Sequence, residues 1–103
     1  MPVVINRHHY RAGTMPEPHV YIGRGTPLGN DVSKRGEGYS DDELLHRYER
    51  WLIARISRRD ASVLDALNKI GPDHHLVCSC KPAACHGDVV LRVWEWLAGK
   101  GEL

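Results

Sequence analysis

Three cysteines, a histidine and an aspartate lie close together in the last third of the chain. Cys78, Cys80 and Cys85 are all the cysteines of the protein. His86 follows Cys85 directly, and Asp88 lies two positions further on. A thiolate is a strong nucleophile and a ligand for soft metal ions, and an imidazole exchanges protons near neutral pH. An apolar run precedes this cluster and a helical pattern follows it, so it is the first candidate for chemistry.

One chemistry that fits the cluster is nucleophilic catalysis. Cys85 and His86 fall where the last helix is expected to begin, and the free amides and dipole of a helix N-terminus stabilise a thiolate. We therefore predict a catalytic site in which Cys85 or Cys80 is the nucleophile, His86 is the acid or base, and Asp88 is its partner. The same amides could instead bind an anionic ligand.

Zinc binding is the alternative for the same residues. Three cysteines and one histidine are an accepted tetrahedral set, but structural zinc sites usually use ligand pairs two to four residues apart. Here the spacing is C-x-C-x4-C-H, and the adjacent residues Cys85 and His86 would rarely reach one ion together. Cys78 is interpreted as a core residue, because a free cysteine behaves as a small apolar side chain. The spacing favours the thiol site, with zinc kept as an alternative.

A second segment with candidate chemistry is rich in glycine. Its predicted ligand-binding residues are Gly23, Arg24, Gly25, Thr26, Gly29 and Asn30. Backbone amides in such a loop can surround an anion, and an arginine can bind phosphate or carboxylate in a bidentate manner. The segment lacks the Lys-Ser/Thr ending of a Walker A loop and the last glycine of G-x-G-x-x-G. Taken alone, it is as compatible with a plain turn as with a binding loop.

Strands and helices must position these two segments. Strands are expected at residues 3–6, 19–22 and 75–80, and helices at residues 40–56, 61–70 and 88–98. Ser40 and Glu43 have the spacing of a capping box at the start of the first helix. This order predicts an α/β fold in one domain (residues 1–103), with a small, largely parallel sheet of three to four strands flanked by helices. Ligands of such sheets bind beyond the carboxyl ends of the strands, where both segments lie.

The composition restricts the function classes. The chain has 103 residues, 42% of them hydrophobic and 26% charged, with a formal net charge of +1. That charge argues against a strongly basic nucleic-acid binder, although a local basic patch is compatible with it. No apolar run approaches the roughly 18 residues that span a bilayer, and the N-terminus has no signal-peptide pattern. We therefore expect no membrane association and a cytoplasmic protein with reduced thiols.

The two segments together resemble the signatures of a known family. The run Val20-Tyr21-Ile22-Gly23-Arg24-Gly25-Thr26-Pro27-Leu28-Gly29-Asn30 is similar to VYIGRGSPLGNPF in the domain of unknown function 4326 family. Cys78-Ser79-Cys80-Lys81-Pro82 and Cys85-His86-Gly87-Asp88-Val89 resemble its CWCxPxxCHGDVL signature. More loosely, the second segment resembles the domain of unknown function 488 family. Asp31 and Ser79 depart from the pattern. The resemblance implies a compact bacterial and phage domain without an established activity.

These observations lead to one main hypothesis and two alternatives. The main one is a small enzyme or enzyme-like domain that binds a nucleotide, nucleoside or other phosphorylated ligand between the two segments, with thiol-based transferase or hydrolase chemistry. One alternative is a non-catalytic module that binds nucleic acid through Arg24, Lys34, Arg35 and the arginines of the first helix. The other is a zinc-stabilised structural domain.

Overall fold

The computed structural model describes residues 2–11, 14–23, 25–29, 40–78 and 86–103. The described elements are the strands β1 (Val3–Asn6), β2 (His19–Tyr21) and β3 (His75–Cys78), the short 3-10 helix η1 (Arg7–His9), and the helices α1 (Asp41–Ser57), α2 (Ala61–Asn68) and α3 (His86–Gly99). The strands form one parallel sheet in the order β1-β3-β2. The predicted α/β class and parallel sheet are confirmed.

The central strand explains the apolar run before the cysteines. Leu76 of β3 lies opposite Val4 of β1 and Val20 of β2, and its side chain is fully buried. A strand with neighbours on both sides and helices against its face is apolar at nearly every position. Cys78 ends this strand with no exposed surface, as expected for a core cysteine.

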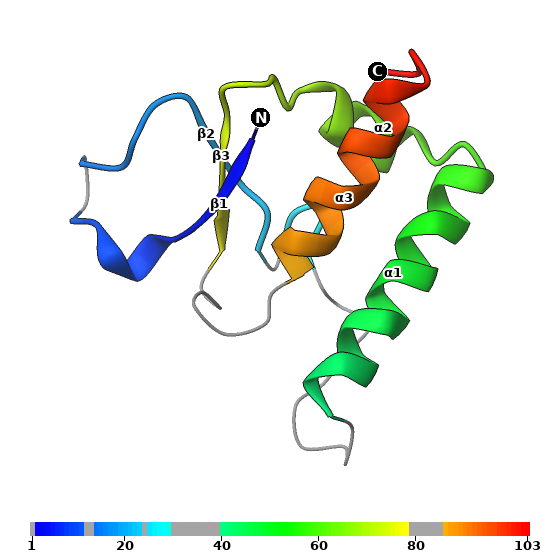
Figure 1. The fold of residues 1–103 in the computed structure, drawn as a ribbon, viewed down its shortest axis with the longest axis horizontal. Helices are drawn as coiled ribbons and strands as arrows, with labels where there is room; N and C mark the ends of the chain where they lie inside the picture. Colours follow the sequence, from blue (N-terminus) through cyan, green and yellow to red (C-terminus); the bar gives the residue numbers. More distant parts are fainter. Residues whose placement is uncertain (1, 12–13, 24, 30–39, 79–85) are drawn as a thin grey trace.

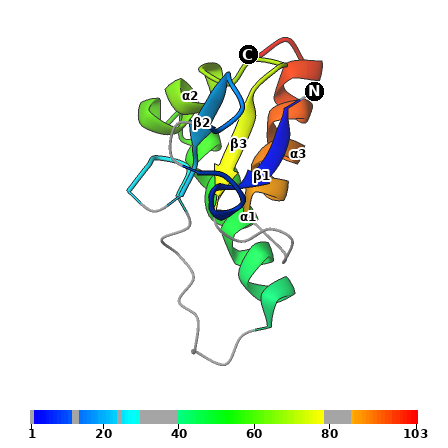
Figure 2. The ribbon, with the colours of Figure 1, turned by 90° about the vertical axis from the view of Figure 1, so that its left-hand side faces the viewer.

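The helices cover one face of the sheet. Figure 2 shows β2, β3 and β1 in front, with α1, α2 and α3 behind them. Residues 7–11 and 14–18, which lead from β1 toward β2, lie on the opposite side of the sheet from the helices (Figure 1). The core is therefore a single layer between the sheet and the helices, and it contains Tyr48, Leu52, Leu67, Leu76, Val90 and Leu97.

The helix boundaries follow local capping. Ser40 caps α1, because its Oγ accepts a hydrogen bond from the amide of Glu43 at 3.2 Å, which confirms the predicted serine cap. Asp60 caps α2 by accepting from the amides of Ser62 and Val63. α3 begins at His86, two residues before the predicted start. His86 therefore lies at the N-terminus of the helix, where it was expected, although the range 88–98 began after it.

Candidate functional site

The glycine-rich segment and the start of α3 meet at the carboxyl edge of the sheet. His86 Nε2 lies 2.6 Å from the carbonyl oxygen of Ile22, the residue directly after β2. A carbonyl oxygen can only accept, so Nε2 carries the proton. His86 is only 6% exposed. Figure 2 shows that the strands run in the same direction and that both segments lie at their carboxyl ends.

A buried tyrosine holds the other end of the glycine-rich segment. The hydroxyl of Tyr48 in α1 donates to the carbonyl oxygen of Leu28 at 2.6 Å, and the tyrosine has no exposed surface. Its ring meets the His86 ring edge-on, with 5.3 Å between the ring centroids and an interplanar angle of 77°. Two buried polar side chains, one from α1 and one from α3, therefore hold the carbonyls of Ile22 and Leu28.

Neither Tyr48 nor these carbonyls is predicted to be functional from the sequence. The available signal is the hydroxyl itself, because a buried phenol usually needs a hydrogen-bond partner. Which acceptor it meets depends on tertiary structure, since Leu28 is 20 positions away in the sequence.

Hydrogen bonds within the glycine-rich segment fold it into two successive turns. The carbonyl of Gly23 accepts from the amide and the hydroxyl of Thr26, at 3.2 and 2.8 Å. The carbonyl of Thr26 accepts from the amide of Gly29 at 2.9 Å. The amides of Thr26 and Gly29 are therefore used inside the segment. Those of Gly23 and Gly25 donate to none of the described residues. Gly23 is buried and Gly25 is exposed, so the amide of Gly25 is the one that an anion could reach.

Two glycines are required by this conformation. Gly25 has a φ of +88°, in the left-handed region, and open space surrounds the position of a Cβ atom there. At Gly29, a Cβ would lie 2.5 Å from the carbonyl oxygen of Gly23, where no side chain fits. The glycine pattern thus has a structural basis in the turns, and this basis is compatible with a ligand at the exposed Gly25.

The first turn of α3 packs tightly against the sheet. A Cβ at Gly87 would lie 2.7 Å from Cγ1 of Val4 and 3.2 Å from Cδ1 of Ile22, so glycine permits the close approach. Asp88 is half-buried in the same turn, where a carboxylate interacts favourably with the positive end of the helix dipole. His86 and Asp88 are therefore both at the predicted edge of the sheet.

Four of the predicted site residues lie outside the described part of the chain. They are Arg24, Asn30, Cys80 and Cys85. Their roles as ligand contacts and nucleophiles stay predictions, and the same holds for the zinc alternative. Within the described residues, no three histidine, cysteine, aspartate or glutamate side chains are grouped so that they could hold a metal ion.

The predicted basic surface is only partly within the described residues. Lys34 and Arg35 lie outside them. Arg55 of α1 is already engaged, because it pairs with Asp60 at 2.8 Å and its guanidinium lies 5.2 Å from the centroid of the Trp51 ring. In the parts of the chain that the structure describes, no helix has the length and apolar character needed to cross a membrane.

Comparison with known proteins identifies a family but no activity. A family model described as Domain of unknown function (DUF4326) matches residues 5–96. Searches of the curated proteins and of the solved structures found no match. The matched residues include both the glycine-rich segment and the start of α3, so the site lies inside the family domain.

Proposed function

As this chain belongs to the DUF4326 family, whose description names no activity, we propose from its geometry that it binds a nucleotide, nucleoside or other phosphorylated small molecule. The ligand would lie at the carboxyl edge of the sheet, between the glycine-rich segment and the start of α3. The cysteines of this corner would make the domain an enzyme with thiol chemistry, of the transferase or hydrolase type.

The observation that carries this proposal is the hydrogen bond between His86 Nε2 and the carbonyl of Ile22. It connects two segments that are 64 residues apart and fixes the start of a 14-residue helix beside the glycine-rich turns. The carboxyl edge of a parallel α/β sheet is the common place for a ligand. Helix N-termini and exposed glycine amides attract phosphate groups.

The thiol part of the proposal rests on the sequence. Cys85 is adjacent to His86, and a thiol at the N-terminus of a helix is expected to be more acidic and more reactive than an ordinary one. Nε2 of His86 donates to the carbonyl of Ile22, which would orient the ring for a role as acid or base at the start of α3.

Isothermal titration calorimetry with nucleoside mono-, di- and triphosphates, and with the parent nucleosides, tests the proposal. We expect at least one phosphorylated member to bind with a Kd of about 1 mM or tighter. Gly25→Ala is expected to weaken the binding of this compound about tenfold, because an alanine in the left-handed region costs roughly 1–2 kcal/mol and shifts the exposed amide. Gly101→Ala is the matched control: Gly101 has a φ of +74° and equally open surroundings, but lies after α3.

Thiol labelling completes the experiment. The bound nucleotide should protect Cys85 from iodoacetamide, as read for each cysteine by peptide mass spectrometry, whereas the buried Cys78 should stay unreactive in either case. If no phosphorylated compound binds, the proposal is wrong. If binding occurs without protection of Cys80 or Cys85, the binding function stands and the thiol chemistry is rejected.

A further inference from the structure

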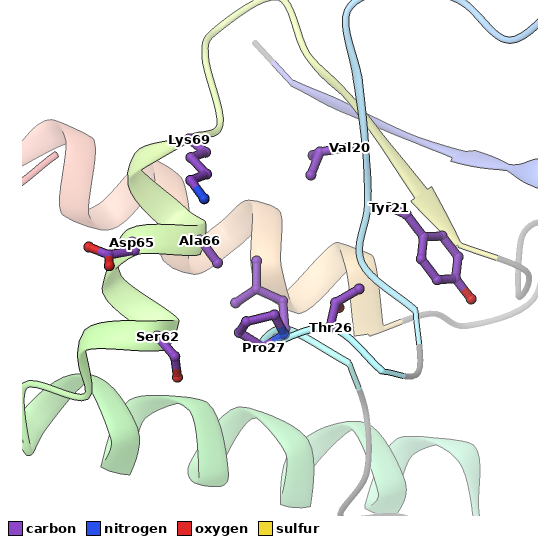
Figure 3. A pocket seen from close by; sticks show the side chains of 9 residues that line it. Val20, Tyr21, Thr26, Pro27, Ser62, Asp65, Ala66 and Lys69 are labelled. Carbon is purple, nitrogen blue, oxygen red and sulfur yellow. The ribbon is translucent and has the colours of Figure 1, made fainter.

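A cavity beside the edge strand β2 is separate from the start of α3. It has a volume of about 360 Å³ and lies between β2, residues 26–28 and α2 (Figure 3). Small-molecule pockets are usually about 300–1,000 Å³, so the cavity is large enough for one small ligand. Among the described residues that line it, none belongs to α3.

The walls of the cavity are mostly apolar. Val20 contributes from β2, Pro27 and Leu28 from the glycine-rich segment, and Ala66 from α2. Ala66 is half-buried and small, and it stands where a larger side chain would close the space between α2 and the sheet (Figure 3). An apolar ring or short chain would gain burial by entering this space.

One cationic side chain is directed toward the same space. Figure 3 shows the ammonium group of Lys69 in the gap between α2 and β2. Lys69 forms no ion pair with any of the described residues. Asp65, one turn earlier, also lines the cavity, and Figure 3 shows its carboxylate on the side of α2 that faces away from the Lys69 ammonium. The positive charge at the rim is therefore available to an anionic group.

The backbone of β2 adds polar groups at this edge. The carbonyl of Pro18 and the amide of Ile22 bond to β3, at 2.9 and 3.0 Å. Because backbone groups alternate along a strand, those of Tyr21 point to the edge that no other described strand pairs with. Tyr21 also lines the cavity. A ligand there would find a backbone donor and acceptor in addition to Lys69.

We propose that this cavity binds a small molecule with an apolar body and one anionic group, a carboxylate or a phosphate. The apolar body would lie against Val20, Pro27 and Ala66, and the anionic group would pair with Lys69. This site shares residues 26–28 with the glycine-rich segment of the proposed function, but its described lining includes no residue of α3, so it can be tested separately.

Titrations of the isotopically labelled protein with 1-naphthoate, 1-naphthyl phosphate and neutral 1-naphthol test the proposal. We expect an anionic probe to shift the NMR signals of the Val20 and Ala66 methyl groups. Lys69→Gln should weaken the binding of the anionic probes about fivefold, since an exposed ion pair contributes up to about 1 kcal/mol. The affinity for neutral 1-naphthol should not change. Lys100→Gln is the control, because Lys100 lies over the Trp96 ring, with its ammonium 4.1 Å from the ring centroid.

A cavity-filling variant tests the position of the apolar body. Ala66→Leu should weaken every probe that binds by at least about tenfold, because the added methyl groups occupy the apolar space. Binding of the carboxylate alone or of the phosphate alone would identify the natural headgroup. The proposal is overturned if no probe shifts Val20 and Ala66, or if the anions bind Lys69→Gln as tightly as the natural chain.

Discussion

Tyr48 and His86 illustrate how two buried polar side chains fix a loop. Each donates one short hydrogen bond to a backbone carbonyl, and the two acceptors, Ile22 and Leu28, stand at either end of the glycine-rich turns. A buried donor or acceptor without a partner costs about 1–3 kcal/mol. The pair therefore favours one conformation of the turns over the alternatives that glycine would otherwise permit.

Tyr48→Phe is expected to lower the free energy of unfolding by about 1–3 kcal/mol, because it leaves the carbonyl of Leu28 buried without this donor. Urea unfolding followed by circular dichroism measures the change. Tyr10→Phe is the matched control, since Tyr10 is 36% exposed, and it should change the stability by less than about 0.5 kcal/mol. Equal effects of the two variants would contradict the anchoring role of Tyr48.

The junction between α1 and α2 depends on one carboxylate. Asp60 caps α2, accepts from the hydroxyl of Ser62 at 2.7 Å, and pairs with Arg55 of α1 at 2.8 Å. The Ser62 hydrogen bond, followed by the Arg55 hydrogen bond, lowers the pKa of Asp60 from 3.8 to about 2. A lowered pKa means that the folded state favours the charged carboxylate, so the capped junction is more stable while Asp60 is ionised.

The stability that Asp60 contributes is expected to depend on pH in the acid range. It is fully present above the unfolded pKa of 3.8 and is lost as the pH falls toward the folded pKa of about 2. Urea unfolding of the natural chain and of Asp60→Asn should therefore differ most above about pH 5 and converge near pH 2. Ser62→Ala should reduce this pH dependence. A difference that stays constant with pH would show that the junction does not use the charge of Asp60.

For the molecule as a whole, the arrangement of the layers decides what is exposed. With α1, α2 and α3 on one face of a three-stranded sheet, β3 carries the centre of the core (Figure 2). α1 and α3 pack side by side and are joined on the surface by the ion pair of Glu49 and Arg92. A core of one layer in 103 residues leaves little excess stability.

Leu76→Ala should therefore destabilise the entire domain. Removing a fully buried leucine between β1, β2 and the helices is expected to cost about 2–5 kcal/mol, out of a total of about 5–15 kcal/mol for a typical domain. Ile53→Ala, at a position that is 42% exposed, should cost far less. Thermal unfolding monitors both variants, and similar melting temperatures would contradict the central place of Leu76 in the core.

The sequence by itself determined the local features of this protein. The helical spacing of apolar residues, the serine cap of α1 and the apolar run of β3 depend on neighbours within a few positions, which the sequence states directly. It also predicted that the glycine-rich segment and the histidine would lie at one edge, because parallel strands have their carboxyl ends together. The start of α3 was placed two residues late, because His86 belongs to no apolar pattern.

Only the tertiary structure decided which atoms meet. The partners of His86 and Tyr48 are backbone carbonyls 64 and 20 residues away, and every residue has such a carbonyl, so no side-chain pattern singles out Ile22 or Leu28. The cavity beside β2 likewise depends on how far α2 stands from an edge strand, which is a property of packing between distant segments. Local periodicity can be read directly from the sequence, whereas contacts between distant segments form only when the helices pack on the sheet.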